Sequence, residues 1–349
     1  MCIVMKRCIL LVITVLILKT DAGLTNFETS SRDWFNDLFR DDLDWKLHRG
    51  QVTNRHGRGN YLYLTTSTSN GKSAILESRI LRTPKRGSCV SFWYRISGKN
   101  PGELKLKRME MTGTKIRTRK LWLRKGDQGR AWNFARVSIP PNPHTRYYQI
   151  IMESKLGSGR GGVVALDDID LDANPCSNSL ENGGFVVDFE TKVTAMKNKR
   201  YGDHFDWVIT KSRAPNSGTG PARDVTSGIG HYLHLSTKGK TPGQRASYSS
   251  NPVRGSTNGA CLSFYYYMHG EGVGKLTVSI LRRSGWVSAA KSVWSKTGSV
   301  DGGWHLARIS LPISLTMQRY DVMFTGTVGK GASGDIALDD ITLINTGIC

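Results

Sequence analysis

The stretch Val164–Leu171 reads VALDDIDL, and it returns 172 positions later as IALDDITL at Ile336–Leu343. Two further stretches recur at the same offset: SCVSFWYRISG (88–98) with ACLSFYYYMHG (260–270), and WNFARVSIP (132–140) with WHLARISLP (304–312). Solenoid units are only roughly 20–50 residues long, so a repeat of this length is a whole domain. The chain therefore carries one domain twice, and we look for its function in that domain and in the differences between the copies.

The chain length agrees with this organisation, because 349 residues suffice for about two domains of roughly 150 each. Pro175 and the pair Gly183-Gly184 interrupt regular structure between the repeats. We therefore predict a first domain over residues 23–176 and a second over 177–349.

Residues 1–22 have the features of an export signal. Lys6 and Arg7 precede an apolar run from Ile9 to Leu18, and the small residue Ala22 marks a cleavage site. A membrane anchor is the alternative, but about ten apolar residues are too few to span a bilayer core of ~30 Å. No later stretch approaches ~18 uninterrupted apolar residues, so we expect a secreted, extracellular protein without a transmembrane segment.

Four cysteines remain after the signal, two in each repeat: Cys89, Cys176, Cys261 and Cys349. They allow three connectivities, and pairing within each repeat lets each copy close independently. Such a bond closes a loop of nearly ninety residues and adds roughly 4–5 kcal/mol by the loop-entropy estimate. Metal binding is the competing use of cysteine, but the chain has no Cys-x-x-Cys pair. We therefore expect structural disulfides.

The net charge of +21 is shared unequally between the repeats. Residues 23–176 carry +12, residues 177–349 carry +7, and the signal carries the rest. A positive field of this size attracts polyanions. For an exported protein, these partners are sulfated glycans, anionic cell surfaces or acidic proteins rather than nucleic acid. General solubility is the alternative explanation.

The local patterns favour strands over helices. Runs such as YLYLTT (61–66) and CVSFWYRI (89–96) combine β-branched and aromatic residues, and Gly-, Pro- and Ser-rich clusters such as GSGRGG (157–162) separate them. No helical periodicity is sustained. We therefore predict an all-β chain with an antiparallel β-sandwich in each repeat.

The same residues resemble the MAM domain, an extracellular module named from meprin, a neuronal surface antigen and a receptor phosphatase. The resemblance rests on marks present in both copies: Phe-Glu near the start, Asp-Trp soon after, Cys-x-Ser-Phe-x-Tyr, and a closing Ala-Leu-Asp-Asp-Ile. It implies two tandem jelly-roll β-sandwich domains and a role in adhesion or protein contact, without catalysis.

The chain departs from the family pattern in two places. Both copies lack the usual pair of N-terminal cysteines, so the resemblance implies one disulfide per repeat, between the central strand and the end of the domain. The first copy is also shorter between Trp45 and Tyr61, which are 16 positions apart, than the second between Trp207 and Tyr232, which are 25 apart. The nine missing residues fall where the second copy reads NSGTGPARDVT (216–226).

Acidic residues of the second repeat suggest a structural Ca²⁺ site. Glu190, Asp224 and one of Asp339 or Asp340 could supply oxygen ligands, and some MAM-like domains hold a cation in such a place. Because side chains alternate along a strand, we expect only one of the two neighbouring aspartates, taken as Asp340, to point at the site. In the alternative, these carboxylates accept hydrogen bonds from turn amides or pair with arginines.

The region from Lys105 to Lys125 holds nine Lys or Arg residues and one internal acid, Glu110. Alternation predicts one cationic face from Lys115, Arg117 and Arg119, and it predicts outward lysines on the preceding strand with the leucines between them turned inward. We take the following residues as a polyanion site: Lys105, Lys107, Lys115, Arg117, Arg119 and Lys120.

The second repeat shows that the fold does not require these charges, because Lys105, Lys107 and Arg117 become Thr277, Ser279 and Ala289. In the alternative interpretation, the lysines protect a solvated sheet edge from aggregation.

Recognised catalytic patterns are missing from the sequence. There is no His-Glu-x-x-His, no Gly-x-Ser-x-Gly and no phosphate-binding Gly-rich loop before a helix. We therefore predict a secreted, non-enzymatic adhesion or extracellular-matrix protein that contacts proteins or polyanions. The alternative is a lectin-like jelly roll that stacks exposed aromatic residues on sugar rings.

Overall fold

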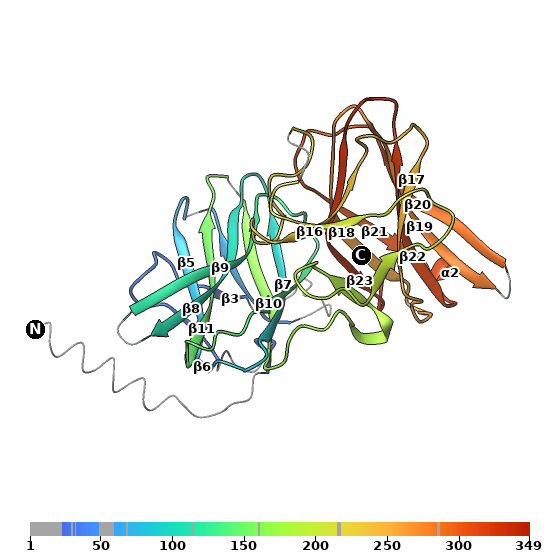
Figure 1. The fold of residues 1–349 in the computed structure, drawn as a ribbon. Helices are drawn as coiled ribbons and strands as arrows, with labels where there is room; N and C mark the ends of the chain where they lie inside the picture. The colour runs from blue at the N-terminus through green and yellow to red at the C-terminus, as the bar shows by residue number, and fades with distance from the viewer. Residues whose placement is uncertain are drawn as a thin grey trace, which may run out of the picture. The chain divides into compact units, whose positions relative to one another are not determined.

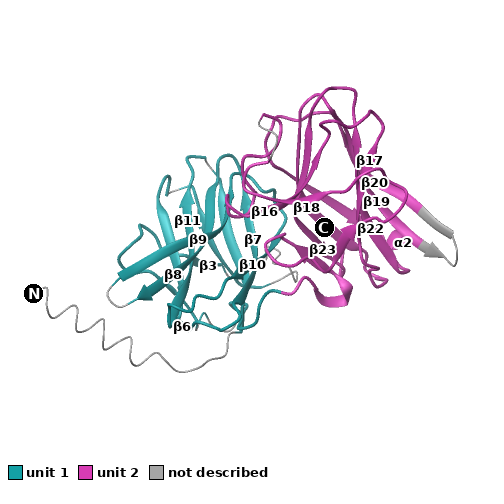
Figure 2. Ribbon diagram, in the orientation of Figure 1, with its two compact units in different colours: residues 1–176 teal, residues 177–349 magenta. Residues whose placement is uncertain are grey.

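The computed structural model describes residues 23–28, 31, 33–48, 59–67, 69–112, 115–159, 161–214, 218–284 and 287–349. The expected export signal, residues 1–22, lies outside these ranges. The chain divides into two compact units, residues 1–176 and 177–349, which Figure 2 colours separately. In the described part of the chain, no helix combines the length and the apolar character needed to cross a membrane.

Unit 1 consists of two antiparallel sheets packed face to face (Figure 1). The first, sheet A, has the order β10-β7-β12-β4-β3, with β1 paired to β12. Its strands are β1 (Leu24–Thr25), β3 (Lys46–His48), β4 (Tyr61–Thr65), β7 (Ser88–Ser97), β10 (Asn133–Ile139) and β12 (Val163–Asp172). The second, sheet B, has the order β2-β5-β11-β8-β9, with β6 paired to β11. Its strands are β2 (Trp34–Asn36), β5 (Ser73–Ser78), β6 (Leu81–Arg82), β8 (Gly102–Thr112), β9 (Lys115–Lys125) and β11 (Tyr147–Leu156).

Unit 2 repeats this topology. Sheet C has the order β15-β16-β23-β18-β21, with β13 paired to β23, and sheet D has the order β14-β17-β22-β19-β20. The strands of sheet C are β13 (Phe185–Val187), β15 (Val208–Lys211), β16 (His231–Ser236), β18 (Ala260–His269), β21 (His305–Leu311) and β23 (Asp335–Ile344). Those of sheet D are β14 (Met196–Asn198), β17 (Arg245–Ser250), β19 (Val273–Ser284), β20 (Val287–Thr297) and β22 (Tyr320–Val328). Two short turns complete the unit, η1 (Glu181–Gly183) and α2 (Ile313–Thr316).

Each unit has its own hydrophobic core between its two sheets. At the centre of unit 1, Trp122 packs edge-on against Phe92 with ring centroids 5.0 Å apart. In unit 2, Trp294 packs against Phe264 in the same way at 5.3 Å. The apolar residues that recur in the sequence are therefore the residues that join the sheets, and burying such aromatic pairs stabilises each sandwich.

A second buried tryptophan of each unit, Trp45 or Trp207, is held in place by one asparagine. In unit 1 the Trp45 amide donates to Asn36 Oδ1 (2.8 Å), and Asn36 Nδ2 donates to the Trp45 carbonyl (3.2 Å). In unit 2 Asn198 makes the same two bonds with Trp207, at 3.0 and 2.8 Å. Both polar ends of the asparagine are thus satisfied, which fixes how the chain enters the core.

The predicted fold class is confirmed: the chain is all-β, with two tandem jelly-roll sandwiches. The runs chosen as strands from composition are β4 and β7 of unit 1, and their equivalents in unit 2 are β16 and β18.

Candidate functional site

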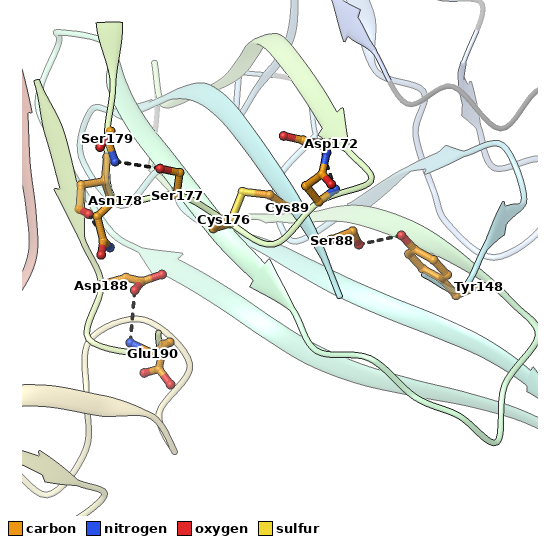
Figure 3. The surroundings of a disulfide bond; sticks show 12 residues. Ser88, Cys89, Tyr148, Asp172, Cys176, Ser177, Asn178, Ser179, Asp188 and Glu190 are labelled. Atoms are coloured by element: carbon orange, nitrogen blue, oxygen red, sulfur yellow. Dashed lines mark hydrogen bonds between the residues drawn. A yellow bond between two sulfur atoms is a disulfide. The ribbon is translucent and has the colours of Figure 1, made fainter. Parts of the chain in front are cut away.

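One disulfide closes each unit. Cys89 on β7 bonds Cys176, which follows β12, and Cys261 on β18 bonds Cys349, which follows β23. Figure 3 shows the first bond, with Ser88 and Tyr148 nearby, whose hydroxyl groups are hydrogen-bonded at 2.8 Å. In both units the bond ties the last residues of the domain to a strand inside its first sheet, next to the strand that they follow.

The cationic residues of the β8–β9 hairpin do not form one patch. Lys107 lies opposite Lys120, whereas Arg108 lies opposite Arg119, and Glu110 lies opposite Arg117. Directly paired residues share a face, and neighbours along a strand do not. Lys120 therefore shares the outer face of sheet B with Lys105 and Lys107, and the six residues taken as one polyanion site do not share a face.

Lys115, Arg117 and Arg119 lie on the opposite face of the hairpin, because they pair with Thr112, Glu110 and Arg108. Alternation along one strand was read correctly. What it could not show is how the faces of the two strands match, since the register of the hairpin decides that.

Lys105 and Lys107 are half-buried and paired with acids. Lys105 contacts Glu103 and Glu153, and Lys107 contacts Glu153. Burial opposes the ionisation of Glu153, but the two lysines outweigh it and lower the pKa of this carboxyl. In the second repeat Lys105, Lys107 and Glu153 are all neutral, as Thr277, Ser279 and Thr325. Glu103, the other partner of Lys105, becomes Lys275, so the second repeat does not carry this ion cluster.

Two arginines of the hairpin are structural. Arg108 is 3% exposed, donates to the Pro140 carbonyl, pairs with Glu110 (2.8 Å) and lies over the Tyr148 ring at 4.7 Å. Arg124 is also buried and lies over the Trp122 ring at 4.9 Å. These contacts hold both guanidinium groups inside unit 1, so neither is presented to a partner.

Three cations of the hairpin share the other face and are not used in these contacts: Lys115, Arg117 and Arg119. We call them the cationic tip. All six residues from Lys115 to Lys120 are exposed. No carboxylate among the described residues forms an ion pair with a member of the tip.

The topology adds two cations that sequence reasoning missed. Arg82 pairs with Tyr147, which pairs with Met111, which in turn pairs with Ile116 of the tip strand. Arg146 lies over the Tyr147 ring at 5.3 Å. Both arginines are exposed at this end of sheet B. No sequence signal marked them, because only the pairing of β6 with β11 shows that residues 82 and 146 lie at the same end of sheet B as the hairpin tip.

The acidic residues of the second repeat do come together, but around a loop. Glu190 accepts the His231 amide (2.6 Å) and pairs with His231 Nδ1 (3.1 Å). Asp224 accepts the amides of Ser227 (2.6 Å) and Gly230 (2.7 Å). A Cβ added to Gly230 would collide with the Glu190 carboxylate and would lie 3.0 Å from Asp224 Oδ2, so both carboxylates surround this glycine.

Asp339 and Asp340 both face this loop, contrary to the expectation from alternation. The Val225 amide donates to Asp339 Oδ2 (3.1 Å), and the Thr226 hydroxyl donates to Asp340 Oδ2 (2.8 Å). A β-bulge interrupts the pairing of β23 with β18 here, and Asp340 has a φ of +47°. This left-handed residue breaks the two-residue period, so neighbours reach the same side.

The oxygens expected to bind Ca²⁺ thus already accept hydrogen bonds from amides and hydroxyls of residues 224–231. Within the described ranges, no group of three or more His, Cys, Asp or Glu side chains is arranged to hold a metal ion. This geometry fits the alternative, in which the carboxylates fix the loop. A Ca²⁺ ion held by Glu190, Asp224 and Asp340 stays a prediction.

The loop is also tied to the outer face of sheet C. Trp304 Nε1 donates to the Arg223 carbonyl (2.9 Å), and the Tyr232 hydroxyl donates to the Pro221 carbonyl (3.3 Å). The nine residues that the first repeat lacks correspond to this part of the chain. The described residues of this longer segment, 218–226, are therefore hydrogen-bonded to the sandwich.

Fold and site together define a pair of disulfide-closed jelly-roll modules, the first of which carries a cationic hairpin. The sequence model for the MAM domain (meprin/A5/mu) matches residues 25–177 and again 187–349. The chain therefore belongs to the MAM domain family.

Relatives share part of this chain. Human MAM domain-containing protein 2 is 30% identical over 183 residues, which is 52% of this chain and 26% of that protein. Neuropilin-1 of Xenopus laevis is 36% identical over 130 residues, which is 37% of this chain and 14% of that protein. The chain spans about a quarter of the length of the first of these relatives.

Among solved structures, the tandem CBM22 domains of Paenibacillus barcinonensis Xyn10C align with 94% of this chain and 98% of their own. The TM-score is 0.33 and the sequence identity is 13%.

Proposed function

We propose that the protein is an extracellular, non-enzymatic adhesion or matrix protein, and that the cationic tip of unit 1 binds sulfated or acidic polyanions. Membership of the MAM family and two disulfides, which persist in oxidising compartments, support the extracellular adhesive role. The exposed tip, Lys115, Arg117 and Arg119, is the observation that carries the polyanion role.

The spacing of the tip suits a polyanion. Successive members lie about 7 Å apart, since a strand advances ~3.4 Å per residue. Arg82 lies at the same end of sheet B but shares the face of Ile116, so it adds to the positive field around the tip and not to the row of contacts. Arginine binds sulfate and carboxylate groups with two parallel hydrogen bonds, which favours these ligands over a simple counterion.

Retention on a heparin column tests the proposal with two variants of equal charge loss. In K115S/R117S/R119S the tip is neutralised, and we expect salt-sensitive retention to be lost. The slope of log affinity against log salt should fall by about 2–3, roughly one per lost contact. In the control K105S/K107S/K120S, which neutralises the outer face, we expect most retention to remain. Equal losses in both variants would mean that net charge alone drives binding and would contradict the proposal.

The lectin-like alternative gives a different outcome. A glycan array would then show binding to neutral sugars that does not depend on salt, and the tip variant would bind as the native protein does.

Two modules on one chain also allow two partners to be joined, provided that both can be engaged together.

A further inference from the structure

A charged tripeptide, Lys125-Gly126-Asp127, ends strand β9 and begins the loop that follows it. Lys125 and Asp127 are both exposed. Within the described part of the chain, neither side chain forms an ion pair. Loops on a rigid scaffold are where proteins most often carry binding residues. Two charges of opposite sign, on either side of a glycine, are therefore available to a partner.

The backbone of this loop is held by two hydrogen bonds to unit 1. The Gly126 amide donates to the Gly102 carbonyl (2.8 Å), and the Gln128 amide donates to the Ile96 carbonyl (2.7 Å). Gly126 has a φ of +77°, a left-handed conformation that glycine adopts without steric cost. The tripeptide is thus presented on an ordered turn. A partner that binds it would pay little for ordering the backbone.

The Asp127 carboxylate is oriented by the same turn. Its Oδ1 accepts the Gly129 amide at 2.9 Å, a bond that aspartate often makes in turns. Among the described residues, Oδ2 of this carboxylate accepts no hydrogen bond. Hard divalent cations such as Mg²⁺ and Ca²⁺ are bound by oxygen ligands, and carboxylates are prominent among them. Asp127 therefore offers one oxygen to a cation that a partner holds.

The second repeat has the same loop backbone. Gly298, the counterpart of Gly126, has a φ of +75°, and its amide donates to the Gly274 carbonyl at 2.8 Å. The Val300 amide donates to the Met268 carbonyl at 2.7 Å, as the Gln128 amide does to Ile96. The fold therefore requires the glycine and the two backbone bonds at this place.

The fold does not require the two charges. At the matching position Lys125 becomes Thr297. Asp127 becomes Ser299, whose hydroxyl accepts the Gly270 amide at 3.0 Å and is used inside unit 2. The charged pair is therefore an addition to a loop that both repeats share, and it is carried by the first repeat alone.

The tripeptide is separate from the cationic tip. Arg119, the member of the tip nearest in sequence, lies six positions before Lys125 on β9. At ~3.4 Å per residue these two positions are about 20 Å apart. Asp127 also places a negative charge in the loop, and this charge repels a polyanion. A complementary partner instead offers a divalent cation to the carboxylate and an acidic group to the lysine.

We propose that the loop of Lys125, Gly126 and Asp127 docks onto an adhesion receptor that holds a divalent cation. Asp127 completes the coordination of that cation, and Lys125 pairs with an acidic residue of the receptor. Opposite charges at the two ends of the tripeptide fix the direction of the contact. A Cβ at Gly126 would meet no atom within 4 Å, so the receptor can approach the backbone between them. This inference shares the extracellular role of the proposed function and does not depend on its polyanion ligand.

Adhesion of fibroblasts to surfaces coated with the full chain tests this inference, with excess soluble heparin present to occupy the cationic tip. The native protein should hold cells in Mg²⁺ and release them in EDTA. A soluble Arg-Gly-Asp peptide, which carries the same charges around a glycine, should compete. D127N should lower adhesion roughly tenfold or more, because asparagine keeps the acceptor for the Gly129 amide and loses the charge. K125T, which carries the residue of the second repeat, should lower it less.

The matched control is D172N. Asp172 is also exposed in unit 1, and its Oδ1 accepts the Asn174 amide (2.9 Å) in a turn of the same kind, so D172N should hold cells as the native protein does. A native protein that holds no cells, adhesion that survives EDTA, or equal adhesion of D127N and D172N would each overturn the inference.

Heparin retention separates this inference from the proposed function. D127N should be retained on heparin as the native protein is. The tip variant K115S/R117S/R119S should keep its cation-dependent adhesion, so either idea can fail without the other.

Discussion

Both repeats begin with an equivalent hydrogen bond, but its acceptor is an amide oxygen in unit 1 and a carboxylate oxygen in unit 2. In unit 1 the Glu28 amide donates to Asn26 Oδ1 (3.2 Å), and in unit 2 the Glu190 amide donates to Asp188 Oδ1 (3.1 Å). Figure 3 shows the second of these bonds. Burial, with a smaller effect of Glu190, raises the pKa of Asp188 to about 6. The fold therefore needs an oxygen acceptor at this place and not a charge.

The same lesson applies to the surface. Both units keep the disulfide and the hydrogen bonds of Asn36 or Asn198 to the following tryptophan. The units differ in the charges of the hairpin, in the side chains that match Phe35 and Leu38, and in the loop of residues 218–230. Features that recur are those that join the sheets, and features that differ are where we place binding. Each prediction below breaks or sharpens this comparison by changing one repeat and using the other as its control.

Loss of a disulfide should have the largest effect. The variant C261S/C349S should destabilise unit 2 by roughly 4–5 kcal/mol, because its unfolded chain regains the entropy of an open loop. Urea unfolding followed by tryptophan fluorescence measures the change. C89S/C176S should have a similar effect on unit 1, since the two loops are nearly equal in length at 87 and 88 positions. A midpoint unchanged in both variants would contradict this role.

Replacing Asp188 by Asn should stabilise unit 2 and remove a pH dependence. Because the pKa of Asp188 is raised in the folded state, its contribution is most favourable below about pH 4 and is lost as the pH rises to about 6. The cost at pH 7 is roughly 3 kcal/mol at 1.36 kcal/mol per unit. D188N should thus exceed the native protein in stability at pH 7 and match it near pH 4.

The reverse exchange in unit 1 is the control. Asn26 is exposed whereas Asp188 is buried, so N26D should leave the stability of unit 1 nearly independent of pH over this range. Unfolding free energies of the native protein and both variants, measured from pH 4 to 8, test this prediction. Parallel curves for the native protein and D188N would show that Asp188 ionises without cost and would contradict it.

Adding one methyl group at Gly230 should cost about 1–3 kcal/mol, because the carboxylates of Glu190 and Asp224 occupy that space. The control is G347A, since a Cβ at Gly347 meets no atom within 4 Å. Thermal unfolding should separate the two variants. An equally small shift in both would mean that the loop adjusts freely around the carboxylates.

The smallest effect is expected from a chelator. If amides and hydroxyls satisfy Glu190, Asp224 and Asp340, EDTA should leave the thermal midpoint of unit 2 unchanged. A cation present at 100 times its dissociation constant would instead add about 2.7 kcal/mol, which a chelator would remove. A lower midpoint in EDTA, restored by Ca²⁺, would establish the cation site.

The sequence predicted the architecture because the repeated marks lie on core strands. It could not predict the faces of the hairpin, because alternation within Lys115–Lys125 does not reveal that Thr112 pairs with Lys115. It also placed Asp339 and Asp340 on opposite sides, because a left-handed residue leaves no mark in the pattern. The apolar cavity beside β2 could not be predicted either, because only the folded chain brings Phe35, Leu47 and Leu76 around one space.

The position of the first disulfide sets how far unit 1 can lengthen under tension. If force pulls on the chain from both ends, the covalent link between Cys89 and Cys176 bypasses the 87 positions between them. At about 3.5 Å per residue, this withholds about 300 Å of slack. A module joined in this way gives only a short tether when it is torn open, so molecules linked through it would resist separation as a stiff strand.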